Sequence, residues 1–432
     1  MTAAHKTNRN IILVVLILAV VITLIMARQA RDRMIKKIQT HSQSQVNDFD
    51  RWMVEVPEFL YQKVDYVSDS FPTPPVTLLV FAPFTFLSSP DAQFAWVCCK
   101  FLFCMLIFYC LWLMVRRTGV ELSTLAVLLI LAAWIWPVLG DMQEGQTNLL
   151  MLLPLAAGIC MAQLDLPRWQ WVGGALVGLA VCIKVTPIIF LIFFLFKRRW
   201  HIAGGILLGL LLGLIVIPAL AFGWQQNMHW LIEWTKIMIL PYVARGQVAY
   251  FEGQSVPSFL SRLLRHVPAF VSHSGTPVYV NVLNLPENVC NWIIRGVLGV
   301  AGLYGLWWSR KAFTTLRCRR YVLEVGAVGA FELWASQRTW VPHFVTLALT
   351  LFAVGMVLSD PRQEKQVRKF ALFALIANAI LMFMTSDVGM IFGPDGHGWL
   401  LTFGVSLWAS VLLVAVIFVA AASSDELPAG KT

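Results

Sequence analysis

Long apolar runs alternate with short polar segments from residue 11 to residue 421. A transmembrane α-helix needs about 20 mostly apolar residues in succession. The pattern predicts spans at 11–27, 92–114, 121–139, 148–163, a broken pair at 173–182 and 186–196, then 202–222, 290–308, 322–335, 341–358, 370–385 and 399–421. We therefore expect an all-α polytopic membrane protein with about 10–12 transmembrane helices, forming a single domain over residues 1–432.

Two polar segments between the spans are long, at 28–75 and 223–289. Residues 76–90 are apolar but short and contain two prolines, which favours an interfacial or re-entrant piece over a span. The first span, 11–27, follows a polar start and lacks a good cleavage site, so we expect a retained signal anchor. No repeat and no matching pair of broken halves is visible, although many transporters show such symmetry.

Basic residues divide unevenly between the two sets of short loops. With the N-terminus inside, the predicted inner loops hold nearly all of the Lys and Arg, whereas the outer loops hold only Arg338. Positive charge in short loops sets orientation, so we expect cytoplasmic termini and long loops on the extracytoplasmic side. To keep Lys197 inside, the segment 173–196 must break at Lys184-Val185-Thr186-Pro187, where proline disrupts the helix.

Composition removes several other classes of protein. Apolar residues make up 58% of the chain and charged residues 13%, against about 25% charged in a soluble globular domain. The net charge of +10 follows from the loop bias and is no nucleic-acid footprint. Most of the eight cysteines fall in or beside apolar spans without zinc-ligand spacing, which predicts small core residues and no metal site.

Two aspartates stand in the first polar segment after the first span. Asp48 and Asp50 belong to the run Val46-Asn47-Asp48-Phe49-Asp50-Arg51-Trp52. A carboxylate just outside the bilayer can act as a general base on a lipid-carried substrate. An ordinary solvated acid is the simpler interpretation of any single loop aspartate, because catalytic groups are the minority.

Further polar groups fall on the same predicted side of the membrane. They are Gln146, Asn148, Lys184, Gln254, Arg338 and His343. Each has a simpler explanation alone, such as a helix cap for Asn148 or headgroup contact for Lys184. Together they match glycosyl transfer from a lipid phosphate, in which one carboxylate takes a proton and cations stabilise the leaving phosphate. Direct displacement with a single base inverts the anomeric centre.

Several motifs carry a family resemblance over roughly residues 46–360. They are Asp48-Phe49 with Trp52, Pro74-Pro75, Gly145-Gln146-Thr147-Asn148, Gly173-Gly174 with Gly178, Lys184-Val185-Thr186-Pro187, Gly253-Gln254-Ser255, and Ser336 with Trp340 and His343. In this order they resemble glycosyltransferase family 87, the polyprenol-phosphate-mannose-dependent mannosyltransferases of the GT-C class. The chain departs from the family pattern at Thr73, Gly253 and Pro342, which leaves the donor sugar and the phosphate contacts open.

The resemblance implies a GT-C-type bundle and an inverting hexosyltransferase without a cofactor. The expected donor is a polyprenyl-phosphate sugar, mannose above all, and the acceptor a glycan or glycolipid at the extracytoplasmic face of a bacterial plasma membrane. It favours Asp48 over Asp50 as the base. Two alternatives stay open: a lipid-linked sugar transporter or flippase, and a polyprenyl-diphosphate-dependent glycan ligase or polymerase, for which segment 223–289 supplies several Arg and His residues.

Overall fold

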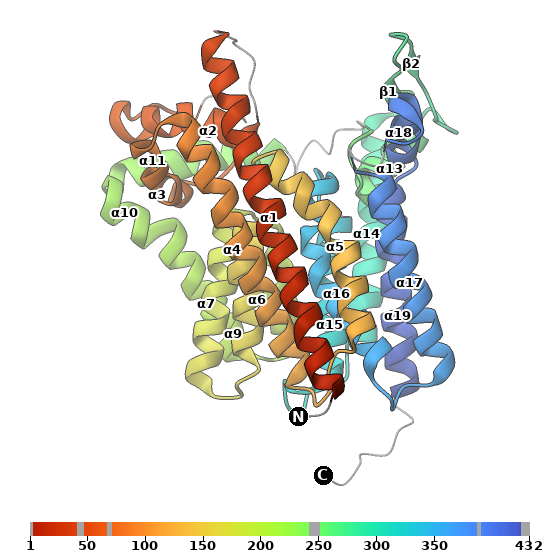
Figure 1. The fold of residues 1–432 in the computed structure, drawn as a ribbon. Helices are drawn as coiled ribbons and strands as arrows, with labels where there is room; N and C mark the ends of the chain where they lie inside the picture. The colour runs from red at the N-terminus through yellow and green to blue at the C-terminus, as the bar shows by residue number, and fades with distance from the viewer. Residues whose placement is uncertain (1–2, 41–46, 67–70, 242–250, 387–389, 425–432) are drawn as a thin grey trace.

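The chain folds into a bundle of packed helices with shorter elements gathered at one end (Figure 1). The computed structural model describes residues 3–40, 47–66, 71–241, 251–386 and 390–424, with the side chains of 3–19 left out. Within these ranges seven helical segments are long and apolar enough to cross a membrane: Ser89–Arg116, Thr124–Gln143, Trp200–Phe222, Glu287–Trp308, Val341–Ser359, Lys365–Met384 and Val405–Ala422. The predicted all-α polytopic membrane protein is confirmed.

The bundle contains helices from the whole length of the chain. They are α1 (Ala3–Gln39), α4 (Ser89–Arg116), α5 (Thr124–Gln143), α6 (Asn148–Ala162), α7 (Pro167–Ile183), α8 (Ile189–Phe196), α9 (Trp200–Leu210) with η4 (Leu211–Val216) and α10 (Ile217–Phe222), α14 (Glu287–Trp308), α15 (Arg319–Ala335), α16 (Ala348–Ser359), α17 (Lys365–Met384) and α19 (Val405–Ser424).

The remaining elements lie mainly at the upper end of the bundle in Figure 1. They are α2 (Asp48–Pro57), η1 (Glu58–Gln62), α3 (Val76–Phe81), η2 (Ala82–Phe86), η3 (Thr186–Ile188), α11 (Trp224–Trp234), η5 (Thr235–Ile239), α13 (Val256–Leu264), α18 (Gly393–Thr402), η6 (Val341–Leu347), and the hairpin of β1 (Phe270–Val271) and β2 (Pro277–Val278). Helix α1 begins and α19 ends at the opposite, lower end. The two long polar segments therefore contribute to the same end.

Helix α16 lies at the centre of the bundle. Every residue from Ala348 to Leu358 is buried, and the helix packs against α4, α5, α15, α17 and α19. A helix that is apolar on all sides belongs in the interior, because it has no polar face to turn outward. This central position fixes η6, which precedes α16 and carries His343 into the upper end.

Helices α7 and α9 approach closely through glycines. A Cβ atom on Gly174 would lie 2.2 Å from the carbonyl oxygen of Ile202, and one on Gly178 would lie 2.3 Å from that of Ile206. Small residues four positions apart let two backbones pack together inside a membrane, where apolar burial alone gives no drive to associate. The glycine spacing of the 173–178 segment thus positions α7, whose end carries Lys184.

Helix α1 is longer than the sequence pattern predicted. The expected span ended at residue 27, whereas the helix continues to Gln39. Its continuation is held by ion pairs of Arg31 with Asp91, at 3.1 Å, and of Lys37 with Asp50, at 2.6 Å. An apolar-run criterion ends where charges begin, but these charges have partners and so the helix need not stop there.

Two proline and glycine positions decide where other helices break. The predicted break near Lys184 is confirmed, since α7 ends at Ile183 and Pro187 opens the next short helix. The single span expected at 399–421 is wrong, because the chain breaks between α18 and α19. Gly404 lies there with φ +67°, a left-handed conformation that glycine adopts without a Cβ clash.

An aromatic platform supports α2 at the upper end. It consists of buried residues from α2, η1, the segments between η1 and α3, α3 itself, α11 and the start of α4: Phe49, Trp52, Phe59, Tyr66, Phe71, Phe81, Trp96, Trp230 and Trp234. The rings of Phe49 and Trp96 stack with centroids 5.1 Å apart. The segment 76–90, expected to be too short for a span, contains α3 and η2, which lie on this platform, and the start of α4. Aromatic packing of this kind holds the first turn of α2 against α4.

Candidate active site

The first turn of α2 fixes the backbone of Asp48. Asn47 caps the helix, its side-chain oxygen accepting from the Asp50 N–H at 3.0 Å. The Asn47 amide also exchanges hydrogen bonds of 3.3 and 3.2 Å with Gln93 on α4. The Asp48 N–H donates to the Glu144 carbonyl at 3.1 Å. Asp48 is therefore tied to both α4 and the end of α5, although its segment follows a long polar stretch.

The turn after α5 brings Gln146 onto Asp48. Gly145 has φ +68°, and a Cβ atom there would lie 2.7 Å from the Phe49 nitrogen, so only glycine fits this approach. The Trp96 indole donates to the Gly145 carbonyl at 3.2 Å. The Gln146 amide then donates directly to Asp48 Oδ2. This contact explains why glycine and glutamine stand together in the Gly-Gln-x-Asn motif.

Burial raises the pKa of Asp48 above its ordinary value of 3.8. The positive charges of Arg51, Lys184 and Lys100 oppose that rise. Arg51 pairs with Asp48 Oδ1 at 3.2 Å, and about a quarter of the Asp48 side chain, 26%, stays exposed. A carboxylate that is partly desolvated yet accessible is a stronger base than a fully solvated one.

Asp50 lies on the same turn but faces a different partner. Its side chain is buried and pairs with Lys37 of α1 at 2.6 Å. The two predicted aspartates are thus separated by their surroundings: Asp48 contacts the Gln146 turn, and Asp50 anchors α1 to α2. The structure places Asp48, rather than Asp50, beside the other predicted site residues.

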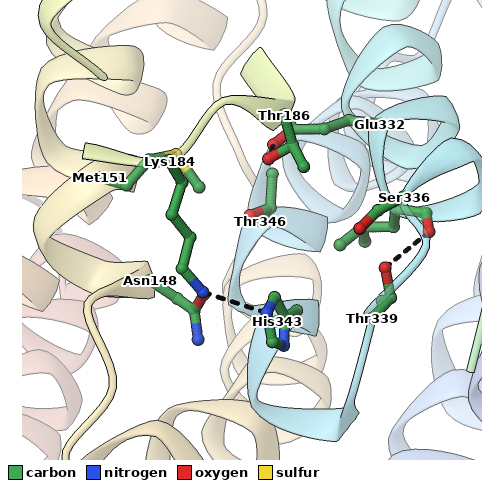
Figure 2. A pocket seen from close by; sticks show the side chains of 10 residues that line it. Asn148, Met151, Lys184, Thr186, Glu332, Ser336, Thr339, His343 and Thr346 are labelled. Carbon is green, nitrogen blue, oxygen red and sulfur yellow. Dashed lines mark hydrogen bonds between the residues drawn. The ribbon is translucent and has the colours of Figure 1, made fainter. Parts of the chain in front are cut away.

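Lys184 follows the last turn of α7 and contacts two other predicted residues (Figure 2). Its ammonium donates to Asn148 Oδ1 and lies 3.0 Å from His343 Nε2. The His343 Nδ1 atom accepts from the Trp340 N–H at 3.2 Å. A neutral imidazole that accepts at Nδ1 carries its proton on Nε2. Lys184 and His343 are then two adjacent donors, which could both donate to one anion lying beside them.

These residues line a small cavity between α6, the Lys184 turn, α15 and η6. Apart from Met151 and Leu333, its lining is polar: Asn148, Lys184, Thr186, Glu332, Ser336, Thr339, His343 and Thr346 (Figure 2). Its volume of about 10 Å³ is close to the space one water molecule needs. A sugar phosphate is much larger than this volume.

Two cavity atoms have unused hydrogen-bonding capacity. Within the part of the chain that the structure describes, Asn148 Nδ2 and Glu332 Oε2 are buried and make no hydrogen bond of ordinary geometry, although the Asn148 amide also interacts with the Asp141 carboxyl. Glu332 Oε1 accepts from the Thr186 hydroxyl at 2.6 Å. Buried polar atoms without partners are costly. A donor and an acceptor held ready in one cavity therefore indicate a polar ligand.

Sequence reasoning missed a buried ion pair beneath this site. Lys100 of α4 pairs with Asp141 of α5 at 2.9 Å, and neither side chain is exposed. Lys100 also donates to the Asp141 carbonyl at 2.5 Å, and that carbonyl accepts from the Gln146 N–H at 3.2 Å. The pair thus supports the Gln146 turn from below. Lys100 and Glu332 share a signal that sequence alone offers: an ionisable residue inside an apolar span.

Two predicted residues lie away from the cavity lining. The Gln254 side chain is buried and donates to the carbonyls of Leu401, at 2.7 Å, and Phe251, at 3.0 Å. Its backbone N–H meets the carbonyl of Thr339, so it braces the turn behind the cavity. Arg338 is exposed on that same turn. The structure therefore does not bring Gln254 or Arg338 to Lys184 through their side chains.

One cluster in the described residues has the spacing of metal ligands, and it is not part of the cavity. Asp65, His229 and Glu233 place their ligating atoms within 4.8 Å of one another. His229 Nε2 lies 2.9 Å from Asp65 Oδ1, and the Tyr66 N–H donates to Glu233 at 3.1 Å. These contacts fasten the segment after η1 to α11, which accounts for the cluster without a metal.

Known proteins resemble this chain over most of its length. The sequence profile of glycosyltransferase family 87 matches residues 71–328. A protein of Mycobacterium tuberculosis, named polyprenol-phosphate-mannose-dependent alpha-(1-2)-phosphatidylinositol mannoside mannosyltransferase, is 24% identical over 311 residues, covering 66% of this chain and 62% of the relative. Its namesake in Mycolicibacterium smegmatis is 27% identical over 317 residues, covering 68% and 63%.

The alignments span less than two thirds of either relative. No solved structure matches the chain. Asp48, Glu332 and His343 lie outside the matched range of residues, whereas Gln146, Asn148 and Lys184 lie inside it. Because the match covers more than half of the sequence, the chain belongs to glycosyltransferase family 87.

Proposed function

We propose that this protein is an inverting mannosyltransferase that takes mannose from a polyprenyl-phosphate donor and passes it to a glycan or glycolipid. One observation carries the proposal: a single turn of chain, residues 146–148, touches both a half-buried carboxylate and a cationic cavity. Asp48 contacts Gln146, and two residues further Asn148 contacts Lys184, which meets His343. The names of the two mycobacterial relatives support the same donor and a phosphatidylinositol mannoside as the first acceptor to test.

In the proposed reaction, Asp48 takes the proton of an acceptor hydroxyl as that oxygen attacks the anomeric carbon of the sugar. The bond from this carbon to the phosphate oxygen breaks, and the polyprenyl phosphate leaves with the electron pair. A single base opposite the leaving group inverts the anomeric centre. Gln146 and Arg51 hold the Asp48 carboxylate in place. Asp50 cannot share this role while Lys37 engages it in a buried pair.

The leaving phosphate needs stabilisation by positive and hydrogen-bonding groups. Lys184 supplies charge, and His343 and the Asn148 amide supply donors. Donors held in advance around developing negative charge contribute strongly to catalysis, because they need no reorganisation during the reaction. These three residues therefore form the proposed phosphate subsite, on the opposite side of the cavity from Thr186 and Glu332 (Figure 2).

The test is transfer by the purified protein in liposomes with labelled polyprenyl-phosphate mannose and phosphatidylinositol mannosides. We expect acceptor-dependent release of polyprenyl phosphate, and a product in which the anomeric configuration is opposite to that of the donor. Donors with glucose or a diphosphate linkage are the comparison. Movement of intact donor across the bilayer without transfer would instead support a flippase, and activity only with the diphosphate donor would support a ligase or polymerase.

We also propose that the upper end faces the extracytoplasmic side of a bacterial plasma membrane and that both termini are cytoplasmic. The concentration of Lys and Arg in the opposite loops supports this orientation. In a cysteine-free background, Tyr61→Cys at the upper end and Ala312→Cys at the lower end both replace exposed residues. An impermeant thiol reagent should label Tyr61→Cys in intact cells and Ala312→Cys only after permeabilisation; the reverse result contradicts the orientation.

A further inference from the structure

Glu332 is a buried carboxylate that the proposed reaction leaves unused. It lies near the end of α15, and only 3% of the residue is exposed. One oxygen accepts from the Thr186 hydroxyl at 2.6 Å, while Oε2 has no hydrogen-bond partner among the described residues. Glu332 lines the same cavity as Lys184 and His343 (Figure 2). The cavity therefore has a pole of donors and, across from it, one free acceptor.

A second buried glutamate on the same helix has its negative charge neutralised by cations of the protein. Glu324, also in α15, pairs with Lys197 at 2.6 Å and with Arg320 at 2.7 Å. Both glutamates are buried, but the structure shows no ion pair for Glu332 within the described residues. Removing a carboxylate from water without a cation is expensive. A carboxylate kept in that condition beside a ligand cavity is typical of a binding residue.

The donor side and the acceptor side of the cavity suit two parts of a sugar phosphate, its phosphate and a sugar hydroxyl. The Lys184 pole suits a phosphate, and the free Glu332 oxygen repels it while accepting readily from a hydroxyl. Resting on the proposed function, we propose that Glu332 accepts a hydrogen bond from a hydroxyl of the donor sugar and selects among sugars by its position. A site that bonds a hydroxyl discriminates strongly against an analogue lacking it, because its own polar group is then left unpaired.

A purely structural role would work through Thr186 instead. Thr186 belongs to the Lys184-Val185-Thr186-Pro187 turn, so its bond to Glu332 could simply hold Lys184 in position. The two roles use different oxygens of one carboxylate. Glu332→Gln keeps an oxygen for the Thr186 hydroxyl and puts an N–H₂ group where the free acceptor was. Thr186→Val removes the bond to Oε1 and leaves the free oxygen in place.

The experiment measures kcat/KM of wild type, Glu332→Gln and Thr186→Val with polyprenyl-phosphate mannose and its singly deoxygenated analogues. Glu332→Gln should lower kcat/KM for the full donor by about 10- to 100-fold, the range of a hydrogen bond to a charged group. In wild type, one deoxy analogue should lose a similar factor. In Glu332→Gln, this analogue should have the same kcat/KM as the full donor, because the hydrogen bond between the hydroxyl and Glu332 is already absent. Thr186→Val should keep the wild-type ranking of donors.

Two results overturn the inference: Glu332→Gln lowers kcat/KM equally for every donor, or Thr186→Val changes the ranking of donors in the same way as Glu332→Gln. Either result leaves the mannosyltransferase proposal intact. A wild-type protein that uses none of the phosphate-linked donors overturns the proposed function itself. Glu332→Asp is the second variant if Glu332→Gln fails to fold: it keeps the charge but shortens the reach, and it should alter the ranking of the deoxy donors. An unaltered ranking in Glu332→Asp equally contradicts the inference.

Discussion

The two ends of the helical bundle bury charged residues in different ways. At the lower end, buried Asp360 pairs with Arg319 at 2.7 Å and Arg362 at 2.9 Å, and Glu324 pairs with Lys197 at 2.6 Å. Each of these carboxylates meets a cation. Charges matched in this manner connect helix ends and loops, and they leave little capacity for a ligand.

At the upper end the charges are buried but incompletely matched. Lys184 faces a neutral amide and an imidazole, and Glu332 faces a hydroxyl. The upper end also contains two matched buried pairs, Lys37–Asp50 and Lys100–Asp141. Among the described residues, however, no ion pair offsets the desolvation cost of Lys184 and Glu332 in the cavity. The difference indicates that the cavity residues, unlike the buried charges of the lower end, obtain their missing partners from a ligand.

The largest expected effect is the loss of the base. Asp48→Asn should lower kcat by about 10²–10⁴-fold, because an amide cannot take the acceptor proton. Its Tm should stay close to that of wild type, since Asp48 is partly exposed and Asn keeps a similar shape. The measurements are mannosyl transfer in liposomes and thermal unfolding in detergent.

Asp50→Asn is the matched control for that variant. It breaks the buried pair with Lys37 and should lower Tm, while the remaining folded protein keeps transferring. If Asp50→Asn abolishes transfer and Asp48→Asn does not, the base is assigned to the wrong aspartate. If neither changes turnover, the upper end does not use a carboxylate base.

Removal of a buried lysine should have opposite consequences at the two ends. Lys184→Ala should lower transfer by about 10²–10³-fold, the cost of losing one donor to developing negative charge, with a modest change in Tm. Lys197→Ala should lower the free energy of unfolding by about 1–3 kcal/mol, less than the cost of a wholly unpaired buried charge, because Arg320 still pairs with Glu324. The paired measurements are kcat per folded molecule and denaturant unfolding of both variants.

Lys184→Arg sharpens the same comparison. It keeps the positive charge but replaces a compact ammonium with a planar guanidinium. Activity between those of wild type and Lys184→Ala would show that charge matters as well as shape. Wild-type turnover in Lys184→Ala would reduce Lys184 to a structural residue, equivalent to Lys197.

Most of the fold was predictable because a membrane helix requires a long run of apolar residues, which is visible in the sequence. The runs located the long helices and the break near Lys184, since a bilayer demands length and proline interrupts a helix. Two boundaries failed for specific reasons. Helix α1 extends through charges that its neighbours neutralise, and Gly404 breaks an apolar run that composition alone describes as continuous.

The candidate site was predictable only as a set of residues on one side of the membrane. Topology alone could group Asp48, Lys184 and His343, but it could not show which side chains face one another. Gln254 turns toward backbone carbonyls instead of the cavity. Glu332 was overlooked because it belongs to no spacing motif, although a glutamate inside an apolar run is itself a signal of function. Its unpartnered oxygen is a property of packing, which a sequence does not display.

A smaller effect is expected in the pH dependence of transfer. Burial raises the pKa of Asp48, and its protonated form cannot act as a base. Activity should therefore be present above this raised pKa and fall as the pH is lowered through it. Well below the pKa, the transfer rate should drop about tenfold for each pH unit. Arg51 lowers the pKa, so Arg51→Gln should move the acidic limb to higher pH. An acidic limb unchanged in Arg51→Gln would assign it to another group.

The smallest effect is expected for an ion pair that shares the upper end but not its burial. Arg31 and Asp91 lie 3.1 Å apart with about half of each side chain exposed. Water solvates both charges whether or not they pair, so Arg31→Ala should change neither transfer nor Tm measurably. This variant tests whether a charge matters because it lies at the upper end or because it is buried. A strong loss of transfer in Arg31→Ala, with Tm unchanged, would mean that the basic surface of the upper end contributes to substrate binding. The distinction between the two ends would then rest on where their charges lie rather than on which buried groups lack partners.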